Sequence, residues 1–151
     1  MQSTRTDSGR EEGRFVYTEF FRHDPPVRGE DVAMGKRVLV VEDEIINAMA
    51  LAEALPGWGI SVVDTVTSGE DAIRIAEEQK PDVVLMDIGI HGSVDGVSAA
   101  REIIGRLGIP VIFMTGYDDE ETIRRAKSLN PLAYLVKPLD AKRLMELLQG
   151  I

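Results

Sequence analysis

The sequence contains no cysteine, no long uninterrupted apolar run and no leader-like start. Without cysteine the chain can form neither a disulfide framework nor a thiolate metal site, and it has no cysteine nucleophile. No apolar run approaches the roughly 18 residues that a membrane span needs. The first seven residues lack the basic stretch followed by an apolar stretch that is typical of a signal peptide. These absences predict a cytoplasmic protein.

Positive charge is also scarce. The 151 residues include 17 lysines and arginines against 26 aspartates and glutamates, which gives a net charge of −9. Because such a chain repels phosphate backbones, we expect no nucleic-acid binding. An acidic surface serves solubility equally well, and the sequence leaves that choice open.

The chain divides into two parts. Residues 1–33 are rich in Arg, Glu, Asp, Ser and Gly, show no sustained period and contain Pro25 and Pro26 in tandem, so a loosely ordered arm is expected. The apolar cluster in residues 15–21 either docks elsewhere as a helical turn or belongs to an upstream extension before a start at Met34. Residues 34–151 are expected to form one compact domain.

From residue 36 onward, short apolar runs alternate with amphipathic stretches. The runs are aliphatic or β-branched and predict five strands: Val38–Val41, Ile60–Val66, Val83–Met86, Val111–Met114 and Ala133–Val136. Helical periodicity is marked by Ile45, Met49 and Ala52, by Ala72, Ile75 and Ala76, by Val97, Ala100, Ile104 and Leu107, by Ile123, Ala126 and Leu129, and by Leu144, Leu147 and Leu148. Residues that favour a helix N-terminus are Ser68, Asp118, Asp119 and Asp140.

This (βα)5 order predicts an α/β fold. Strands as continuously apolar as these are buried on both faces, which requires a parallel sheet with helices on each side and right-handed crossovers. We therefore predict a flavodoxin-like doubly wound sheet with strand order 2-1-3-4-5, whose first and third strands are neighbours at the switch point.

Acidic, hydroxyl and basic residues follow the predicted strands. Strand one is followed by Glu42, Asp43 and Glu44, strand three by Asp87, strand four by Thr115 and Gly116, and strand five by Lys137 and Pro138. Ligands of open α/β sheets bind beyond the carboxyl ends of the strands, at the switch point. Adjacent carboxylates there repel one another and lose hydration, and a divalent cation offsets both effects.

Magnesium is the natural cation for such a site, because it takes oxygen ligands and commonly accepts one or two carboxylates plus a phosphate oxygen. We expect Glu42, Asp43 and Asp87 to offer carboxylates to Mg²⁺, with the backbone carbonyl of Gly89 as a further candidate. Lys137 would bring a positive charge to the same rim, to pair with a carboxylate or a phosphoryl group.

Each of these residues also has a simpler interpretation. The acidic run could cap the following helix, Asp87 could be a turn residue, Thr115 could end a strand and Lys137 could be a solvated charge. Taken singly, these interpretations are as good as the functional one. All of them at one edge of a sheet would be a rare coincidence, which favours a common site.

Four segments resemble the signature blocks of response-regulator receiver domains, the CheY-like family. They are Val38–Glu44 (VLVVEDE), Val83–Ile88 (VVLMDI), Pro110–Gly116 (PVIFMTG) and Tyr134–Pro138 (YLVKP), and the likeness runs from about residue 36 to the end of the chain. One segment departs from the family: the loop Gly89–Gly96 looks one residue longer and lacks the usual proline. His91 lies in it, either as a solvated side chain or as a ligand or relay group.

The resemblance implies a role for each site residue. Asp87 would be the phosphoacceptor, and Asp43, with Glu42, would hold Mg²⁺ directly or through water. Thr115 would hydrogen-bond the phosphoryl group, Lys137 would be its counter-charge and Tyr134 would be the aromatic switch beside it. The Lys137–Pro138 bond would be cis.

The resemblance also implies a receiver of a two-component or phosphorelay system. Its phosphoryl donor would be a histidine kinase or a histidine phosphotransfer protein, and its output a conformational change read by a protein target. Because the sequence ends at Ile151 we expect a stand-alone receiver with no effector domain, no enzymatic activity beyond its own phosphorylation and dephosphorylation, and no contact with nucleic acid or membrane. Whether phosphorylation drives dimerisation stays open.

Three rival interpretations are weaker. A haloacid-dehalogenase-like phosphatase would use Asp87 as nucleophile, but it would place a second aspartate where this chain has Gly89. A nucleotide or flavin binder would carry a Gly-x-Gly-x-x-Gly or Walker A run, and neither occurs. A degenerate receiver acting only as a binding module would not need the intact set of Asp87, Thr115 and Lys137.

Overall fold

The computed structural model describes residues 35–116 and 118–151. The predictions for residues 1–33, including the apolar cluster at 15–21, lie outside the described residues, as does Met34. Within the described part, no helix has both the length and the apolar character that crossing a membrane requires. The fold below is therefore that of the region predicted to form the compact domain.

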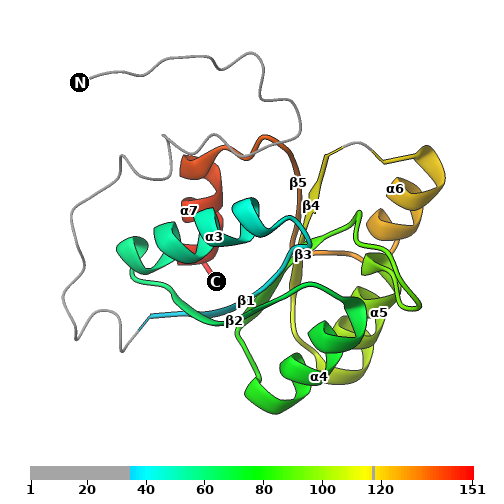
Figure 1. Ribbon diagram of the computed structural model, residues 1–151, viewed down its shortest axis with the longest axis horizontal. Coiled ribbons are helices and arrows are strands. Elements are labelled where there is room, and N and C mark those ends of the chain that lie inside the picture. Colours follow the sequence, from blue (N-terminus) through cyan, green and yellow to red (C-terminus); the bar gives the residue numbers. More distant parts are fainter. Residues whose placement is uncertain (1–34, 117) are drawn as a thin grey trace.

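Five parallel strands form a single sheet in the order β2-β1-β3-β4-β5, as predicted (Figure 1). The predicted runs match the observed strands within one residue at each end, because buried aliphatic runs are good strand formers and end where turn residues begin. The strands are β1 (Arg37–Val41), β2 (Ser61–Val66), β3 (Val83–Asp87), β4 (Val111–Thr115) and β5 (Ala133–Val136).

A helix follows every strand. The α-helices are α3 (Ile45–Ala54), α4 (Gly69–Gln79), α5 (Gly96–Leu107), α6 (Glu120–Lys127) and α7 (Ala141–Gln149), and a short 3-10 helix, η2 (Leu55–Trp58), extends α3. The predicted caps at Ser68, Asp119 and Asp140 are confirmed, since each side chain accepts a hydrogen bond from a backbone N–H of the first turn. Asp95 caps α5 in the same way.

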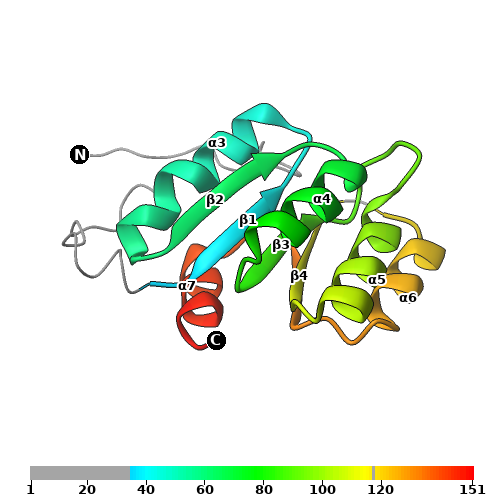
Figure 2. The ribbon, with the colours of Figure 1, turned by 90° about the horizontal axis from the view of Figure 1, so that it is seen from below.

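The helices cover both faces of the sheet. Helices α3 and α7 pack on one face, and α4, α5 and α6 pack on the other (Figures 1 and 2). Alternate strand residues feed the two layers: Val38 and Val40 point toward α3 and α7, whereas Leu39 and Val41 point toward α4 and α5. Burial on both faces explains why β3 and β4 are apolar until their carboxyl ends, whereas β2, an edge strand that is only partly buried, carries Asp64 and Thr65.

The face that α3 turns toward the sheet differs from the predicted one. Its buried residues are Asn47, Ala50, Leu51 and Ala54. Ile45 and Met49, which marked the predicted helix, are 67% and 61% exposed. The helix was predicted correctly, but its sheet-facing side is made of Ala50, Leu51, Ala54 and the polar Asn47, and not of the large apolar residues that indicated the helix.

Candidate functional site

The carboxyl ends of four strands converge on one edge of the sheet. Asp87 is the last residue of β3 and pairs in register with Met114, and Thr115 is the last residue of β4 and pairs with Val136. Glu42 directly follows β1 and Lys137 directly follows β5. The backbone N–H of Lys137 donates to the carbonyl of Thr115 at 2.7 Å, which fixes β5 beside β4 up to the site.

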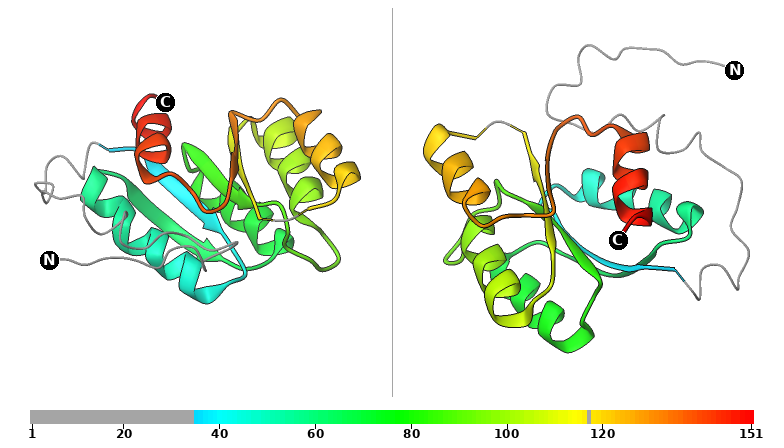
Figure 3. Two further views of the ribbon diagram at one scale, coloured as in Figure 1. Left: turned by 90° about the horizontal axis from the view of Figure 1, so that it is seen from above. Right: turned by 180° about the vertical axis from the view of Figure 1, so that it is seen from behind.

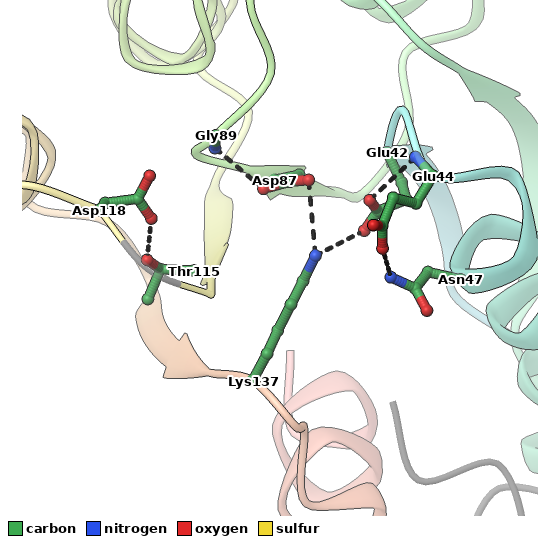
Figure 4. A network of polar contacts seen from close by, with 8 residues as sticks. All are labelled: Glu42, Glu44, Asn47, Asp87, Gly89, Thr115, Asp118 and Lys137. Atoms are coloured by element: carbon green, nitrogen blue, oxygen red, sulfur yellow. Dashed lines mark hydrogen bonds and ion pairs between the residues drawn. The ribbon is translucent and has the colours of Figure 1, made fainter. Parts of the chain in front are cut away.

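Lys137 bridges two buried carboxylates (Figure 4). Its Nζ lies 3.0 Å from Oε1 of Glu42 and 3.5 Å from Oδ2 of Asp87. All three residues are buried, with Glu42 completely inaccessible to solvent. The Lys137 ammonium therefore lies between two carboxyl groups in a poorly solvated place, where the ionisation of each group depends on the others.

The charges in this group shift one another's pKa values. Burial lowers the pKa of Lys137, but the charges of Asp87 and Glu42 outweigh burial and raise it above its ordinary value, so the ammonium stays protonated. Burial, with the nearby charge of Asp87, raises the pKa of Glu42 to about 8 in the metal-free protein, although Lys137 acts in the opposite direction.

Backbone N–H groups hold both carboxylates in place. Oδ1 of Asp87 accepts a hydrogen bond from the N–H of Gly89 at 2.9 Å, and Oε2 of Glu42 accepts one from the N–H of Glu44 at 3.2 Å. Each carboxylate thus has one oxygen bound to the turn that follows its strand and the other beside Lys137. The turns that follow β1 and β3 therefore orient both carboxylates.

The carboxylates of Glu42, Asp43 and Asp87 can share a cation. Each offers one oxygen, and these oxygens lie within 4.8 Å of one another. Oxygens around an octahedral Mg²⁺ lie roughly 3–4 Å apart, so a small inward movement would bring the three to ligand distance. The predicted donor set thus fits Mg²⁺. Glu44 is outside this cluster, because its carboxylate accepts a hydrogen bond from the amide of Asn47.

A pocket of about 760 Å³ opens over the cluster. Its lining includes Asp43, Asp87, Gly89, Asp118 and Lys137. A phosphoryl group attached to Asp87 would fit within it. His91 also lines this pocket, but no bond of its side chain to another described residue supports a role. The Gly89 carbonyl as a metal ligand stays a prediction.

Thr115 and Tyr134 lie on the neighbouring strands β4 and β5. Thr115 is buried, and its hydroxyl donates a hydrogen bond to the carboxylate of Asp118 (Figure 4). Tyr134 pairs with Phe113 across the neighbouring strands, and its buried hydroxyl lies close to the side chain of Thr115. Burial raises the pKa of Tyr134, and Nζ of Lys127 lies 5.1 Å from the centre of its ring. The switch role of Tyr134 stays a prediction.

Sequence reasoning missed two residues of the site. Asp118 was expected only to start a helix, whereas its carboxylate reaches back to Thr115 and lines the pocket. Asn47 is a buried polar residue that fixes Glu44. The spacing of three residues between Thr115 and Asp118, and between Glu44 and Asn47, is typical of local side-chain hydrogen bonds and could have indicated both.

The fold and the site together define a class: a flavodoxin-like protein that can hold a divalent cation beside a buried aspartate at its switch point. A family model described as the response regulator receiver domain matches residues 38–149. The chain therefore belongs to the response regulator receiver domains of two-component systems. The Lys137–Pro138 bond is cis, as that membership led us to expect.

Relatives and solved structures agree with this membership. The transcriptional regulatory protein PdtaR of Mycobacterium tuberculosis is 36% identical over 120 residues, which cover 80% of this chain and 58% of that protein. The transcriptional regulatory protein ZraR of Escherichia coli is 37% identical over 113 residues, 74% of this chain and 25% of that protein. The chain thus spans little more than half the length of PdtaR and a quarter of the length of ZraR.

Among solved structures, the signal receiver domain of a modulated diguanylate cyclase from Desulfovibrio desulfuricans has a TM-score of 0.73 and 37% identity. The match covers 76% of this chain and 91% of that one. The REC domain of the response regulator AraT from Geobacillus stearothermophilus has a TM-score of 0.68 and 28% identity, over 78% and 92% of the two chains. The similarity therefore extends over most of the receiver fold.

We expect the affinity for Mg²⁺ to rise with pH. Glu42 has a folded-state pKa of about 8 against an ordinary value of 4.5. Its protonated form is therefore favoured in the fold, and that stabilisation is lost as pH rises through about 8. Mg²⁺ binds the ionised carboxylate, so binding below about pH 8 must displace a proton.

Calorimetric titration with Mg²⁺ at pH 6, 7 and 8 should show affinity increasing by up to about ten-fold per unit. Glu42→Gln provides the control, since a variant without this proton should lose most of the dependence. Equal affinity at all three pH values in the wild type would exclude Glu42 from the binding equilibrium.

Proposed function

We propose that the protein accepts a phosphoryl group on Asp87, with Mg²⁺ bound beside it, and signals by a change of conformation. The observation that carries this proposal is the buried group formed by Lys137, Glu42 and Asp87 at the base of an acidic pocket. A buried aspartate beside a lysine and a cation-binding cluster is suited to attack on phosphorus. Membership in the receiver family supports the same chemistry.

In this mechanism a carboxylate oxygen of Asp87 forms a bond to phosphorus while the bond from phosphorus to the donor breaks. The Gly89 N–H holds one oxygen of Asp87, which orients the carboxylate in the pocket. Lys137, already 3.5 Å from the other oxygen, offsets the negative charge of the transferring group. Mg²⁺ held by Glu42, Asp43 and Asp87 would neutralise further phosphoryl charge when bound.

The donor in this proposal is a histidine kinase or a histidine phosphotransfer protein, and the output is contact with a downstream protein. The proposal places the protein in the cytoplasm, where such donors act, and limits its own chemistry to gaining and losing one phosphoryl group. The roles of Thr115 and Tyr134 in the conformational change are part of the same proposal.

Incubation with acetyl phosphate and Mg²⁺ tests the phosphoacceptor. The wild type should gain one phosphoryl group by intact-protein mass spectrometry, and Asp87→Asn should gain none, because the amide is not a nucleophile for phosphorus. Asp82→Asn provides a matched control at an exposed carboxylate away from the site. Undiminished modification of the Asp87→Asn variant would contradict the proposal, and continuous release of phosphate over many turnovers would favour a hydrolase instead.

An exposed apolar surface beside the pocket suits a protein donor. Ile45, Ile46 and Met49 on α3 are 67%, 60% and 61% exposed, and they begin directly after Glu44 at the rim of the pocket. Grouped exposed apolar side chains mark contact surfaces. A partner resting on them would bring its phosphohistidine to Asp87, so we place the donor's contact there.

Ile46→Asp should therefore slow phosphotransfer from a histidine kinase that phosphorylates the wild type by about ten-fold or more, the loss typical of one central contact. Phosphorylation by acetyl phosphate should not change, since Asp87 and its neighbours are intact. Leu132→Asp is the matched control: Leu132 is also apolar and 45% exposed, but it precedes β5 at the opposite edge of the sheet. Equal losses in both variants, or a loss with both donors, would contradict this surface.

A further inference from the structure

The hydroxyl of Thr115 has an acceptor that the receiver chemistry does not explain. It donates its hydrogen bond to Asp118, in the segment between β4 and α6 (Figure 4). Asp118 also lines the pocket that contains Asp87 and Lys137. No lysine, arginine or histidine among residues 35–116 and 118–151 forms a salt bridge with Asp118, so Thr115 is the donor that the described structure gives it.

Asp118 and Asp87 face the same small space. Gly89 lies between them, and a Cβ added there would be 3.4 Å from Oδ1 of Asp118 and 3.4 Å from Oδ1 of Asp87. The two carboxylate oxygens are thus at most about 6.8 Å apart, the sum of these two distances. A phosphoryl group bonded to Asp87 would extend toward this space and place its own negative oxygens near both Asp118 and Thr115.

A threonine hydroxyl has one hydrogen to donate. It can donate that hydrogen to Asp118 or to a phosphoryl oxygen, but not fully to both. We propose that Asp118 is the resting-state acceptor for Thr115, and that a phosphoryl group on Asp87 takes the hydroxyl from it. Asp118 is in this role a positioning residue that opposes activation. This inference rests on the proposed function of Asp87.

The exchange has a consequence for α6. After it, Asp118 has lost its donor and faces a phosphoryl anion across a short gap, so it is driven away from the site. The next residue, Asp119, caps α6 by accepting a hydrogen bond from the N–H of Thr122. Displacement of Asp118 therefore moves the start of α6, which lies beside α5 at the β4–β5 side of the molecule (Figure 3). The phosphoryl signal reaches the surface through this helix.

Beryllium fluoride, which binds an aspartate carboxylate as a mimic of the phosphoryl group, tests the competition. Its affinity in the presence of Mg²⁺ is measured from the amide chemical shifts of β4 and α6. Asp118→Ala should bind it about ten-fold more tightly than the wild type, because Thr115 no longer has to leave a charged acceptor. Asp118→Asn, which keeps a neutral acceptor, should gain about three-fold. Glu120→Gln, an exposed change of the same charge, should match the wild type.

The Thr115→Ala background separates hydrogen bonding from charge. If Asp118 acts by holding the Thr115 hydroxyl, Asp118→Ala should tighten the binding of beryllium fluoride to the Thr115→Ala variant by no more than about two-fold. That residual gain comes from removing the negative charge of Asp118. An equal gain in both backgrounds would assign the effect to charge alone and overturn the inference. Failure of Asp118→Ala to tighten binding in the wild-type background would overturn it as well.

A ligand-free measurement keeps this inference separate from the proposed function. The urea midpoints of the wild type, Thr115→Ala, Asp118→Ala and the double variant should be non-additive, because each single change breaks the same hydrogen bond. Additive midpoints would show that Thr115 and Asp118 do not interact in the resting protein, whatever the affinity for beryllium fluoride. The proposed function would fail if the wild type did not bind beryllium fluoride, or if Asp87→Asn still bound it. Non-additive midpoints would even then support the Thr115–Asp118 hydrogen bond.

Discussion

Replacement of Lys137 by methionine is expected to lower the free energy of unfolding by about 3–5 kcal/mol at pH 8, the usual cost of breaking a buried ion pair. The Lys137 ammonium is the cation between Glu42 and Asp87, at 3.0 and 3.5 Å from their oxygens. Methionine fills a similar volume but leaves the two carboxylates facing one another without it. The loss is therefore electrostatic and not a loss of packing.

The effect of pH and of Mg²⁺ on the loss of stability distinguishes an electrostatic cause from a packing defect. Without Lys137, the pKa of Glu42 should rise further above its ordinary value, so the stability that its protonation provides is present at low pH and lost as pH rises. For Glu42 this window extends from about 4.5 to at least about 8. The difference between variant and wild type should thus shrink at pH 5, and Mg²⁺ should stabilise the variant more than the wild type because it replaces the missing charge.

Urea unfolding at pH 5 and pH 8, with and without Mg²⁺, measures these differences. Lys142→Met is the control, since Lys142 is exposed and should change stability by less than about 0.5 kcal/mol. A loss for Lys137→Met that is the same at both pH values would indicate a packing defect. Such a result would contradict the electrostatic account of the site.

Two glycines of α5 are expected to respond in opposite directions to alanine. A Cβ at Gly96 would lie 2.7 Å from the carbonyl oxygen of Asp87 and 3.2 Å from Cα of Ile88, whereas a Cβ at Gly105 would meet nothing within 4 Å. Gly96→Ala should therefore destabilise the fold by about 1–3 kcal/mol through overpacking against backbone that cannot move freely. Gly105→Ala should stabilise it by up to about 1 kcal/mol, since alanine favours an exposed helix position.

The variants Gly96→Ala and Gly105→Ala also test whether the start of α5 holds the turn after Asp87 in place. Because a Cβ at Gly96 would press on the backbone of Asp87, the proposed phosphoacceptor, Gly96→Ala should also slow phosphorylation by acetyl phosphate, and Gly105→Ala should not. Thermal or urea unfolding and the rate of phosphoryl incorporation are measured on the same samples. Stabilisation by both alanines, or equal rates in both, would mean that α5 does not press against the Asp87 turn as the structure indicates.

The sheet could be predicted from the sequence because four of its strands are short apolar runs that end at, or just before, a polar residue. That pattern results from burial on both faces, and it places Glu42, Asp87, Thr115 and Lys137 at one edge before any coordinates are known. The convergence of Glu42, Asp87 and Lys137 is confirmed by their ion pairs, and that of Thr115 by the hydrogen bond from the backbone N–H of Lys137 to its carbonyl. Their chemical roles stay predictions, because contacts alone do not show a reaction.

The directions in which side chains point were harder to predict than the order of the strands and helices. The stripe of Ile45 and Met49 suggested the buried face of α3, but the helix turns Ala50 and Leu51 inward and leaves the larger residues exposed. Helical periodicity indicates an apolar face, but it does not distinguish a face that packs on the sheet from one that meets a partner. The contact of Asp118 with Thr115 was missed for a related reason: a loop side chain has no period to reveal its direction.

The most direct test of the central claim is to locate the phosphoryl group on the chain. Sodium borohydride reduces an aspartyl phosphate to homoserine, so protein phosphorylated by acetyl phosphate is reduced, digested and sequenced by mass spectrometry. The account predicts homoserine at position 87, only after phosphorylation and only with Mg²⁺ present. Homoserine at another aspartate, or a phosphoryl group retained on His91 or Thr115 with Asp87 unchanged, would contradict it.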